Sequence, residues 1–377
     1  VVIYLLLTNK IKVKISSFFK ILLLPWCGLI FANPILLIPP ILCLAFLSKQ
    51  TPSAYALIII LVILTSFIIF NIKIFKTIFF PLMYGSILAI FFLVLFFYFT
   101  EIPINNFWLQ YVLYSKSIGD FRFDQIVLSF RSVFLQYKFI YVPLIVLFIY
   151  ALTMTRNFDK NKKNIFIIIF LILFSLSLIF HQMLTFNQIY IFFLIPLLTA
   201  FVHIFFGSSL IKNKLFLNVI ILICVFSVIK YHYRFNEERK FNELEGIEIN
   251  KSINANILHP SLKGLRWITN VFPKNPQEEI DALKESMTVL KNEKRKKSLI
   301  TSYQFIAPAL SIYDYSPNQW HHPTVSFPIK GQKYFEEYKR FFINNIKQNK
   351  IEVIYTIGKG EENILSLILE NDCFVSK

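Results

Sequence analysis

The sequence has little charge and little glycine for its length. Only 16% of its 377 residues are charged, whereas a soluble domain carries about 25%, and nine residues are glycine. Apolar runs of about 17 residues or more, such as Ala54–Phe70, contain no charge at all. A soluble core helix would show a polar residue every three or four positions, so these runs predict helices that cross a bilayer.

Cysteine is also scarce, and its spacing excludes two classes of site. The chain has four cysteines, and no pair has the spacing of metal ligands. Three of them, Cys27, Cys43 and Cys224, lie in hydrophobic runs, whereas Cys373 lies near the C-terminus. The sequence therefore predicts neither a zinc site nor a disulfide framework.

The net charge of +17 raises the question of nucleic-acid binding. Many of the basic residues flank hydrophobic runs, and the chain contains no recognised nucleic-acid-binding motif. Basic residues in those positions orient membrane helices and contact anionic lipid headgroups. We therefore expect the lipid bilayer, and not nucleic acid, to be the partner of this charge.

Hydrophobic runs divide the first 231 residues into about seven predicted spans. The first contains Pro25, Pro34, Pro39 and Pro40, which favours either one kinked helix or a re-entrant pair. We place the spans at Ile21–Leu47, Ala54–Phe70, Thr77–Phe99, Phe139–Met154, Ile165–Phe180, Gln188–Phe206 and Leu215–Ile229.

Basic residues concentrate in alternate loops, which predicts the orientation. One set of short loops is almost purely basic and should be cytoplasmic. If Ile21–Leu47 crosses once, seven crossings then place the C-terminal domain outside the cytoplasm. The basic set contains Lys10, Lys12, Lys14 and Lys20, then Lys73 and Lys76, then Arg156, Lys160, Lys162 and Lys163, then Lys212 and Lys214.

The chain after the last span predicts a small α/β domain. Asn275 precedes Pro276 and Glu278, the pattern of a helix N-terminus. The apolar runs Ser298–Tyr303 and Ile351–Thr356 predict buried strands, and an apolar stripe from position 334 to 346 predicts a helix between them. The predicted fold class is thus an α-helical multi-pass membrane region (1–231) followed by a soluble extracytoplasmic α/β domain (232–377).

The chain starts with an apolar segment, Val1–Leu7, that runs into basic residues. It is too short to span a bilayer and lacks the cleavage site of a signal peptide. We interpret it as the cytoplasmic end of a helix that begins upstream; a genuine start at this valine is the alternative.

The loop from 100 to 138 is long, aromatic and mixed in charge. Its apolar residues recur at helical spacing, which predicts a helix along the membrane interface with snorkelling basic side chains. The functional alternative is that Arg122 and Arg131 bind an anionic lipid phosphate, because guanidinium forms a bidentate fork with phosphate.

Polar side chains crowd the predicted outer boundary between two spans. Helix capping and interface anchoring would explain them; the functional alternative is a rim that binds a lipid headgroup or sugar. The polar residues at this boundary are His181, Gln182, Thr185, Asn187, Gln188 and Tyr190, and those that we assign to the rim are His181, Asn187, Gln188 and Tyr190. We further predict that the rim converges with Arg122 and Arg131 on one cavity.

The histidines outside the predicted rim are interpreted as structural residues and not as metal ligands. The motif Trp320-His321-His322-Pro323 invites a metal site, but adjacent histidines need a third ligand and none is suitably spaced, so we predict a surface turn. His203 in a span is interpreted as a packed polar residue. No span contains Asp, Glu, Lys or Arg in its interior, which argues against an ion-coupled transporter or channel.

One run resembles a late span of the GT-C superfamily of membrane glycosyltransferases, of the protein mannosyltransferase and aminoarabinose transferase kind. The resemblance also covers the architecture of residues 1–231, and it implies transfer of a sugar from a polyprenyl-phosphate donor on the outer side of the membrane. The run is Asn187-Gln188-Ile189-Tyr190-Ile191-Phe192-Phe193-Leu194-Ile195-Pro196-Leu197-Leu198.

The resemblance leaves the catalytic residue unassigned. Its catalytic acid lies in the first outer loop, which in a truncated chain would precede Val1, so the role is not transferred to Glu101, Asp120 or Asp124. The chain itself implies no cofactor, although a divalent metal could serve the full-length protein at the departing phosphate. The alternatives are a polysaccharide polymerase, ligase or flippase-like protein, and a non-catalytic membrane assembly protein.

Overall fold

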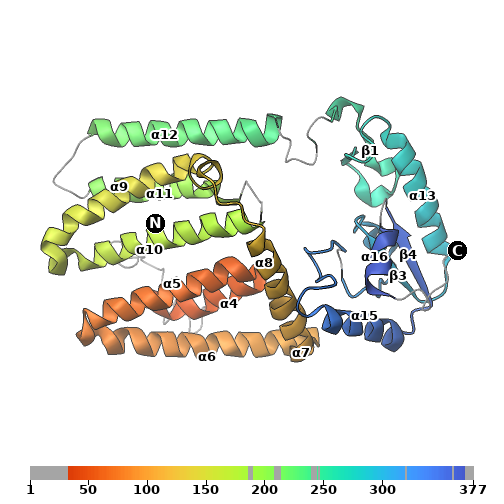
Figure 1. The fold of residues 1–377 in the computed structure, drawn as a ribbon, viewed down its shortest axis with the longest axis horizontal. Helices are drawn as coiled ribbons and strands as arrows, with labels where there is room; N and C mark the ends of the chain where they lie inside the picture. Colours follow the sequence, from red (N-terminus) through yellow and green to blue (C-terminus); the bar gives the residue numbers. More distant parts are fainter. Residues whose placement is uncertain are drawn as a thin grey trace, which may run out of the picture. The chain divides into compact units, whose positions relative to one another are not determined.

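The computed structural model divides the chain into two compact units (Figure 1). It describes residues 33–185, 190–207, 214–238, 244, 247–318, 321–358 and 361–369. The membrane unit comprises Val1–Ile104 and Ile126–Tyr231, and the C-terminal unit comprises Asn105–Gln125 and His232–Lys377.

Every predicted span contains a helix in the residues that the structure describes. Short 3₁₀ segments connect several of them, namely η1 (Pro34–Leu37), η2 (Ile72–Ile74), η5 (Thr155–Asn157) and η6 (Tyr190–Phe193). The helices are α4 (Ile38–Ser48), α5 (Gln50–Ile69), α6 (Phe75–Thr100), α9 (Lys138–Met154), α10 (Phe158–Thr185), α11 (Leu194–Gly207) and α12 (Lys214–His232).

Within the residues that the structure describes, four helical stretches are long and apolar enough to cross a membrane. They are Gln50–Ile69, Ile72–Thr100, Lys138–Thr185 and Lys214–Glu238, and two shorter apolar helices cover Pro34–Ser48 and Ile191–Gly207. The protein is therefore a mostly helical, multi-pass membrane protein. The stretch Lys138–Thr185 comprises α9 and α10, which pack against each other across the turn at η5.

Aromatic contacts establish that α5 and α10 run antiparallel. Phe70 at the end of α5 lies 5.4 Å from Phe158 at the start of α10, between ring centroids. At the other end, Tyr55 of α5 lies 6.1 Å from Phe180 of α10. The basic segment around Lys73 is consequently at the same end of the bundle as the basic segment from 156 to 163, as predicted from their alternation.

Hydrogen bonds show which ends of α9, α11 and α12 lie together (Figure 1). The Tyr150 hydroxyl of α9 donates a hydrogen bond to the carbonyl of Phe205 in α11, 3.1 Å away, at the basic end. At the opposite end the Tyr231 hydroxyl of α12 donates to the carbonyl of Gln136, which precedes α9, over 3.4 Å. The chain therefore leaves α12 for the C-terminal unit at the end that lacks the basic segments.

Close packing holds α4 on α6. Gly85 of α6 is buried, and a Cβ atom built there would clash with the carbonyl oxygen of Leu36 and lie 3.0 Å from Cδ of Pro39. Further along α6, Tyr98 and Phe99 are 75% and 76% exposed, as expected for a helix side that faces lipid.

The C-terminal unit contains the predicted α/β arrangement. Strands β3 (Lys297–Thr301) and β4 (Val353–Ile357) pair in parallel, with Lys297 opposite Val353 and Thr301 opposite Ile357. The predicted strands and helices are thus confirmed. A second, antiparallel pair joins β1 (Ile253–Asn254) and β2 (Arg266–Trp267), and the helices are α13 (Pro276–Asn292), α14 (Ile306–Leu310), α15 (Phe335–Asn349) and α16 (Glu362–Ile368).

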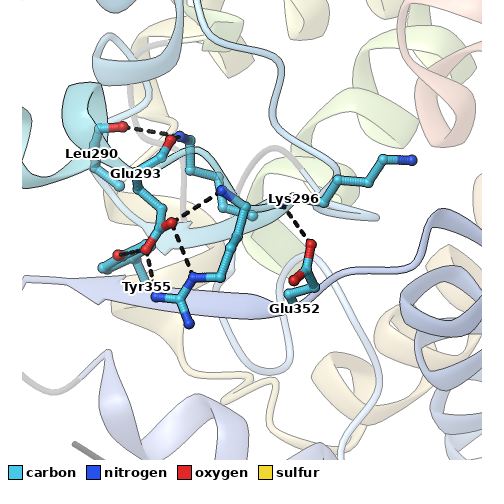
Figure 2. A network of polar contacts seen from close by, with 7 residues as sticks. Leu290, Glu293, Lys296, Glu352 and Tyr355 are labelled. Atoms are coloured by element: carbon cyan, nitrogen blue, oxygen red, sulfur yellow. Dashed lines mark hydrogen bonds and ion pairs between the residues drawn. The ribbon is translucent and has the colours of Figure 1, made fainter.

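A polar network closes the junction between α13 and the sheet (Figure 2). The ammonium of Lys297, which is 8% exposed, donates hydrogen bonds to the carbonyls of Leu290 and Glu293 at the end of α13. The Glu293 carboxylate also accepts hydrogen bonds from Arg295 and, at 2.9 Å, from the Tyr355 hydroxyl of β4. The two bonds from Lys297 satisfy carbonyls at the C-terminal end of α13, which have no intrahelical partner.

The segment between α6 and α9 contributes to the core of the C-terminal unit. It forms α7 (Ile104–Phe107), the π-helix η3 (Trp108–Tyr114) and α8 (Ser115–Asp124), and a second π-helix, η4 (Arg131–Leu135), follows in the membrane unit. Tyr114 is 3% exposed and packs in one apolar cluster with Phe327, Tyr338 and Phe342. The predicted interfacial helix is thus packed against a domain more than 200 residues away in sequence.

Candidate functional site

The predicted phosphate ligands Arg122 and Arg131 belong to different units. Arg122 lies in α8 of the C-terminal unit, is half-buried and donates a hydrogen bond from Nη2 to the carbonyl of Thr324 over 3.4 Å. Its burial lowers the pKa of the guanidinium from the ordinary value, but an arginine remains charged at neutral pH. Arg131 begins η4 in the membrane unit, and its side chain is exposed.

The predicted rim residues are described only in part. His181 lies near the end of α10 and is 2% exposed. Asn187 and Gln188 lie outside the described residues, as does the side chain of Tyr190, whose backbone begins η6. The proposed convergence of these residues with Arg122 and Arg131 on one cavity therefore stays a prediction.

Two further polar residues of α10 are also buried: Ser175, which the sequence analysis did not consider, and Gln182, which it placed at the outer boundary but did not assign to the site. Ser175 and Gln182 are each 1% exposed, and at a spacing of seven they share one face of the helix. The Ser175 hydroxyl and both amide atoms of Gln182 have no hydrogen-bond partner among the residues that the structure describes. Their spacing inside an apolar run is the sequence signal that could have identified them.

Buried polar groups without a hydrogen-bond partner in the protein destabilise the folded state. Such a group costs about 1–3 kcal/mol relative to a hydrogen-bonded one, unless a water molecule or a ligand supplies the bond. Polar groups inside a membrane bundle commonly belong to a functional site for this reason. In chemical terms an amide and a hydroxyl can donate to and accept from the hydroxyls of a sugar.

An apolar cavity of about 420 Å³ lies between α4, α5 and α6. It is lined chiefly by leucine and isoleucine side chains, and the polar groups at its wall are Cys43, Ser53 and Ser86. The Ser53 and Ser86 hydroxyls donate to the carbonyls of Lys49 and Leu82 in their own helices. A cavity of this size and lining suits a hydrocarbon chain.

In the C-terminal unit, the carboxylate of Glu279 is buried and fully hydrogen-bonded. It is 1% exposed and accepts bonds from Trp267 Nε1 at 2.9 Å, the Thr269 hydroxyl at 2.8 Å and the Tyr303 hydroxyl at 2.7 Å. Burial, reinforced by the bond to this carboxylate, raises the pKa of Tyr303 above its ordinary value. With three donors in place, Glu279 connects β2, α13 and the end of β3 and holds them together.

His321 is buried, contrary to the predicted surface turn. It is 5% exposed, and its Nε2 lies 3.0 Å from the Ser316 hydroxyl. Burial lowers the pKa of His321 to about 4, so the imidazole is neutral at pH 7. Its Nδ1 has no partner in the described parts of the chain, so the pair lacks the carboxylate that orients the histidine of a hydrolase triad.

Metal ligands do not converge in the described ranges: no group of three His, Cys, Asp or Glu side chains there could hold a metal ion. In the membrane unit, the polar groups described above are the exposed guanidinium of Arg131 and the buried hydroxyl and amide of the α10 polar face. In comparisons with known proteins, no family model, curated protein or solved structure matches this chain.

Proposed function

We propose that the chain belongs to a membrane glycosyltransferase that moves a sugar from a polyprenyl-phosphate donor to an acceptor on the outer side of a bacterial inner membrane. The observation that carries the proposal is the buried polar face of α10, formed by Ser175 and Gln182. This face lies near His181, toward the end of the bundle opposite the basic segments at Lys73 and Arg156. Sugar hydroxyls would supply the hydrogen bonds that these groups lack.

Two further features support a lipid-linked donor. The apolar cavity between α4, α5 and α6 could receive part of the prenyl chain. Arg131, exposed just before α9, is available to bind the donor phosphate in a bidentate fork. No residue of the described chain is assigned as the base that deprotonates the acceptor.

Topology is part of the proposal. Counting α4 with η1, then α5, α6, α9, α10, α11 and α12, gives seven crossings, with the basic segments inside the cell. The C-terminal unit would then lie on the outer side, because the chain leaves α12 at the end of the bundle opposite the basic segments. Reporter fusions at Asn161 and Lys377 test this, and finding both on one side of the membrane contradicts it.

Donor binding to the full-length protein tests the function. We expect Arg131→Ala to weaken binding of a polyprenyl-phosphate sugar at least tenfold and Arg131→Lys to restore only part of it, since lysine cannot form the fork. Arg156→Ala, at the basic end, serves as the control. Unchanged donor affinity in both Arg131 variants would indicate that Arg131 only anchors the chain at the membrane interface. That result would favour the alternative of a non-catalytic membrane assembly protein.

Product analysis separates the remaining alternatives. A transferase yields one sugar on the acceptor, whereas a polymerase or ligase transfers a chain and a flippase yields no new bond. Membranes containing the full-length protein, a labelled donor and extracted acceptors should give the single-sugar product.

A further inference from the structure

Aromatic packing joins the segment Asn105–Gln125 to the C-terminal unit. The ring of Tyr114 meets the ring of Tyr338 edge to face, with centroids 5.6 Å apart, and Phe327 stacks on the other side of Tyr338 at 5.1 Å. Tyr338 is 1% exposed and Phe327 is fully buried. Without Tyr114, part of this cluster would be exposed to water.

Two hydrogen bonds give the contact a fixed register. The Ser117 hydroxyl donates to the carbonyl of Lys333 over 2.5 Å, and Arg122 donates to the carbonyl of Thr324. Because these donors are five positions apart on α8, sliding the helix by one residue would break both bonds.

The backbone that presents these carbonyls is strained. Thr324 has a φ of 61°, and Tyr334, which follows Lys333, has a φ of 70°. Residues with a Cβ rarely adopt this left-handed conformation, and they retain it only where the surrounding structure requires it. Both strained residues lie in the surface that α8 contacts, so the surface has a shape suited to that helix.

We propose that the part of the C-terminal unit after His232 is the binding surface that orders the segment Asn105–Gln125, and that α8 is its resident ligand. Each element then depends on the other: the surface fixes α8, including Arg122, and α8 supports the strained backbone at Thr324 and Tyr334. Trp108 of η3, by contrast, is 54% exposed. This proposal does not depend on the transferase activity.

Hydrogen exchange of the full-length protein in a membrane mimic tests the dependence. Tyr338→Ala removes the ring that Tyr114 contacts, so the amides of α8 should exchange at least tenfold faster while those of α5 and α10 stay unchanged. Tyr313→Ala is the matched control, because Tyr313 is 73% exposed in the same unit and should leave α8 unchanged.

The dependence must also be reciprocal, because a coupling free energy acts equally in both directions. Tyr114→Ala should therefore accelerate exchange in α15, whereas Trp108→Ala should not. If Tyr338→Ala also accelerates exchange in β3 and β4, the C-terminal unit has unfolded. In that case Ser117→Ala, which removes a single hydrogen bond, tests whether α8 depends on this surface. Unchanged α8 protection in Ser117→Ala together with unchanged α15 protection in Tyr114→Ala would overturn the proposal.

Discussion

Glu279 and Lys297 of the C-terminal unit differ from the polar face of α10 in how their buried polar atoms are hydrogen-bonded. In the C-terminal unit, the Glu279 carboxylate has three donors and the Lys297 ammonium has two carbonyl acceptors. In α10 of the membrane unit, the hydroxyl of Ser175 and the amide of Gln182 have no such partners in the parts of the chain that are described. All four side chains are less than one-tenth exposed, so solvent exposure does not explain the difference.

The difference separates two uses of buried polarity. A fully hydrogen-bonded group positions the elements around it, and removing it leaves several partners unsatisfied. A buried group without protein partners destabilises the fold and is tolerated where a ligand or water completes it. Substitution of Glu279 or Lys297 should therefore reduce stability, whereas substitution of Ser175 or Gln182 should reduce ligand binding.

The largest loss of stability is expected for Glu279→Ala. It leaves Trp267 Nε1 and the hydroxyls of Thr269 and Tyr303 without their acceptor and creates a cavity, which should lower the free energy of unfolding of the C-terminal unit by about 3–5 kcal/mol. Exchange of the β3 amides measures this in the full-length protein. Glu278→Ala is the control, because Glu278 is exposed and accepts only from Asn275. Equal effects of the two variants would refute the structural role of Glu279.

Acid should destabilise the C-terminal unit through His321. The pKa of His321 is about 4 in the folded protein and near its ordinary value of 6.5 when unfolded. Between these values the unfolded state binds more protons, so stability falls as pH decreases from about 6.5 to about 4, by about 3 kcal/mol in total. Thermal denaturation across this range should show a smaller decrease for His321→Gln. His322→Gln, in the exposed neighbour, should retain the full decrease.

Shape rather than polarity should dominate the packing of α4 on α6. Gly85→Ala places a methyl group against the carbonyl of Leu36, so the helices must separate, at a cost of about 1–3 kcal/mol. Detergent-solubilised protein should lose thermal stability accordingly. Gly207→Ala adds the same atom in open space and is the control. An equally stable Gly85→Ala variant would mean that the close approach contributes nothing.

No loss of stability, and the sharpest test of the comparison, is expected for Gln182→Leu. Because the amide lacks protein partners in the described chain, replacing it with an apolar side chain of similar size should leave the free energy of unfolding unchanged or raise it by about 1–3 kcal/mol. Binding of the proposed sugar donor should nevertheless weaken at least tenfold. A large loss of stability would instead show that Gln182 is part of a satisfied structural network.

Local patterns predicted the helices and strands well. The helices within the seven apolar runs and the start of α13 at Pro276 follow from hydropathy and capping, which depend on neighbouring residues. The parallel β3–β4 pair follows from two short apolar runs with a helix between them.

Contacts between distant residues were not predictable in the same way. The docking of Tyr114 against Tyr338 and the burial of His321 are set by tertiary packing, which leaves no periodic signal in the sequence. For the same reason Arg122 and Arg131 were grouped as neighbours along the chain, although they belong to separate units. The spacing of seven between Ser175 and Gln182 is readable from the sequence, but only the structure shows that both side chains are buried.

The bond between Ser117 and Lys333 spans 216 positions, and this separation has a consequence for biogenesis. At about 5–20 residues per second, the ribosome needs about 10–40 s after making Ser117 before it makes Lys333. During that interval the apolar helices α9, α10, α11 and α12 are synthesised, while Tyr338, the packing partner of Tyr114, does not yet exist. A nascent chain released before Lys333 would carry an exposed aromatic segment that chaperones and proteases can recognise.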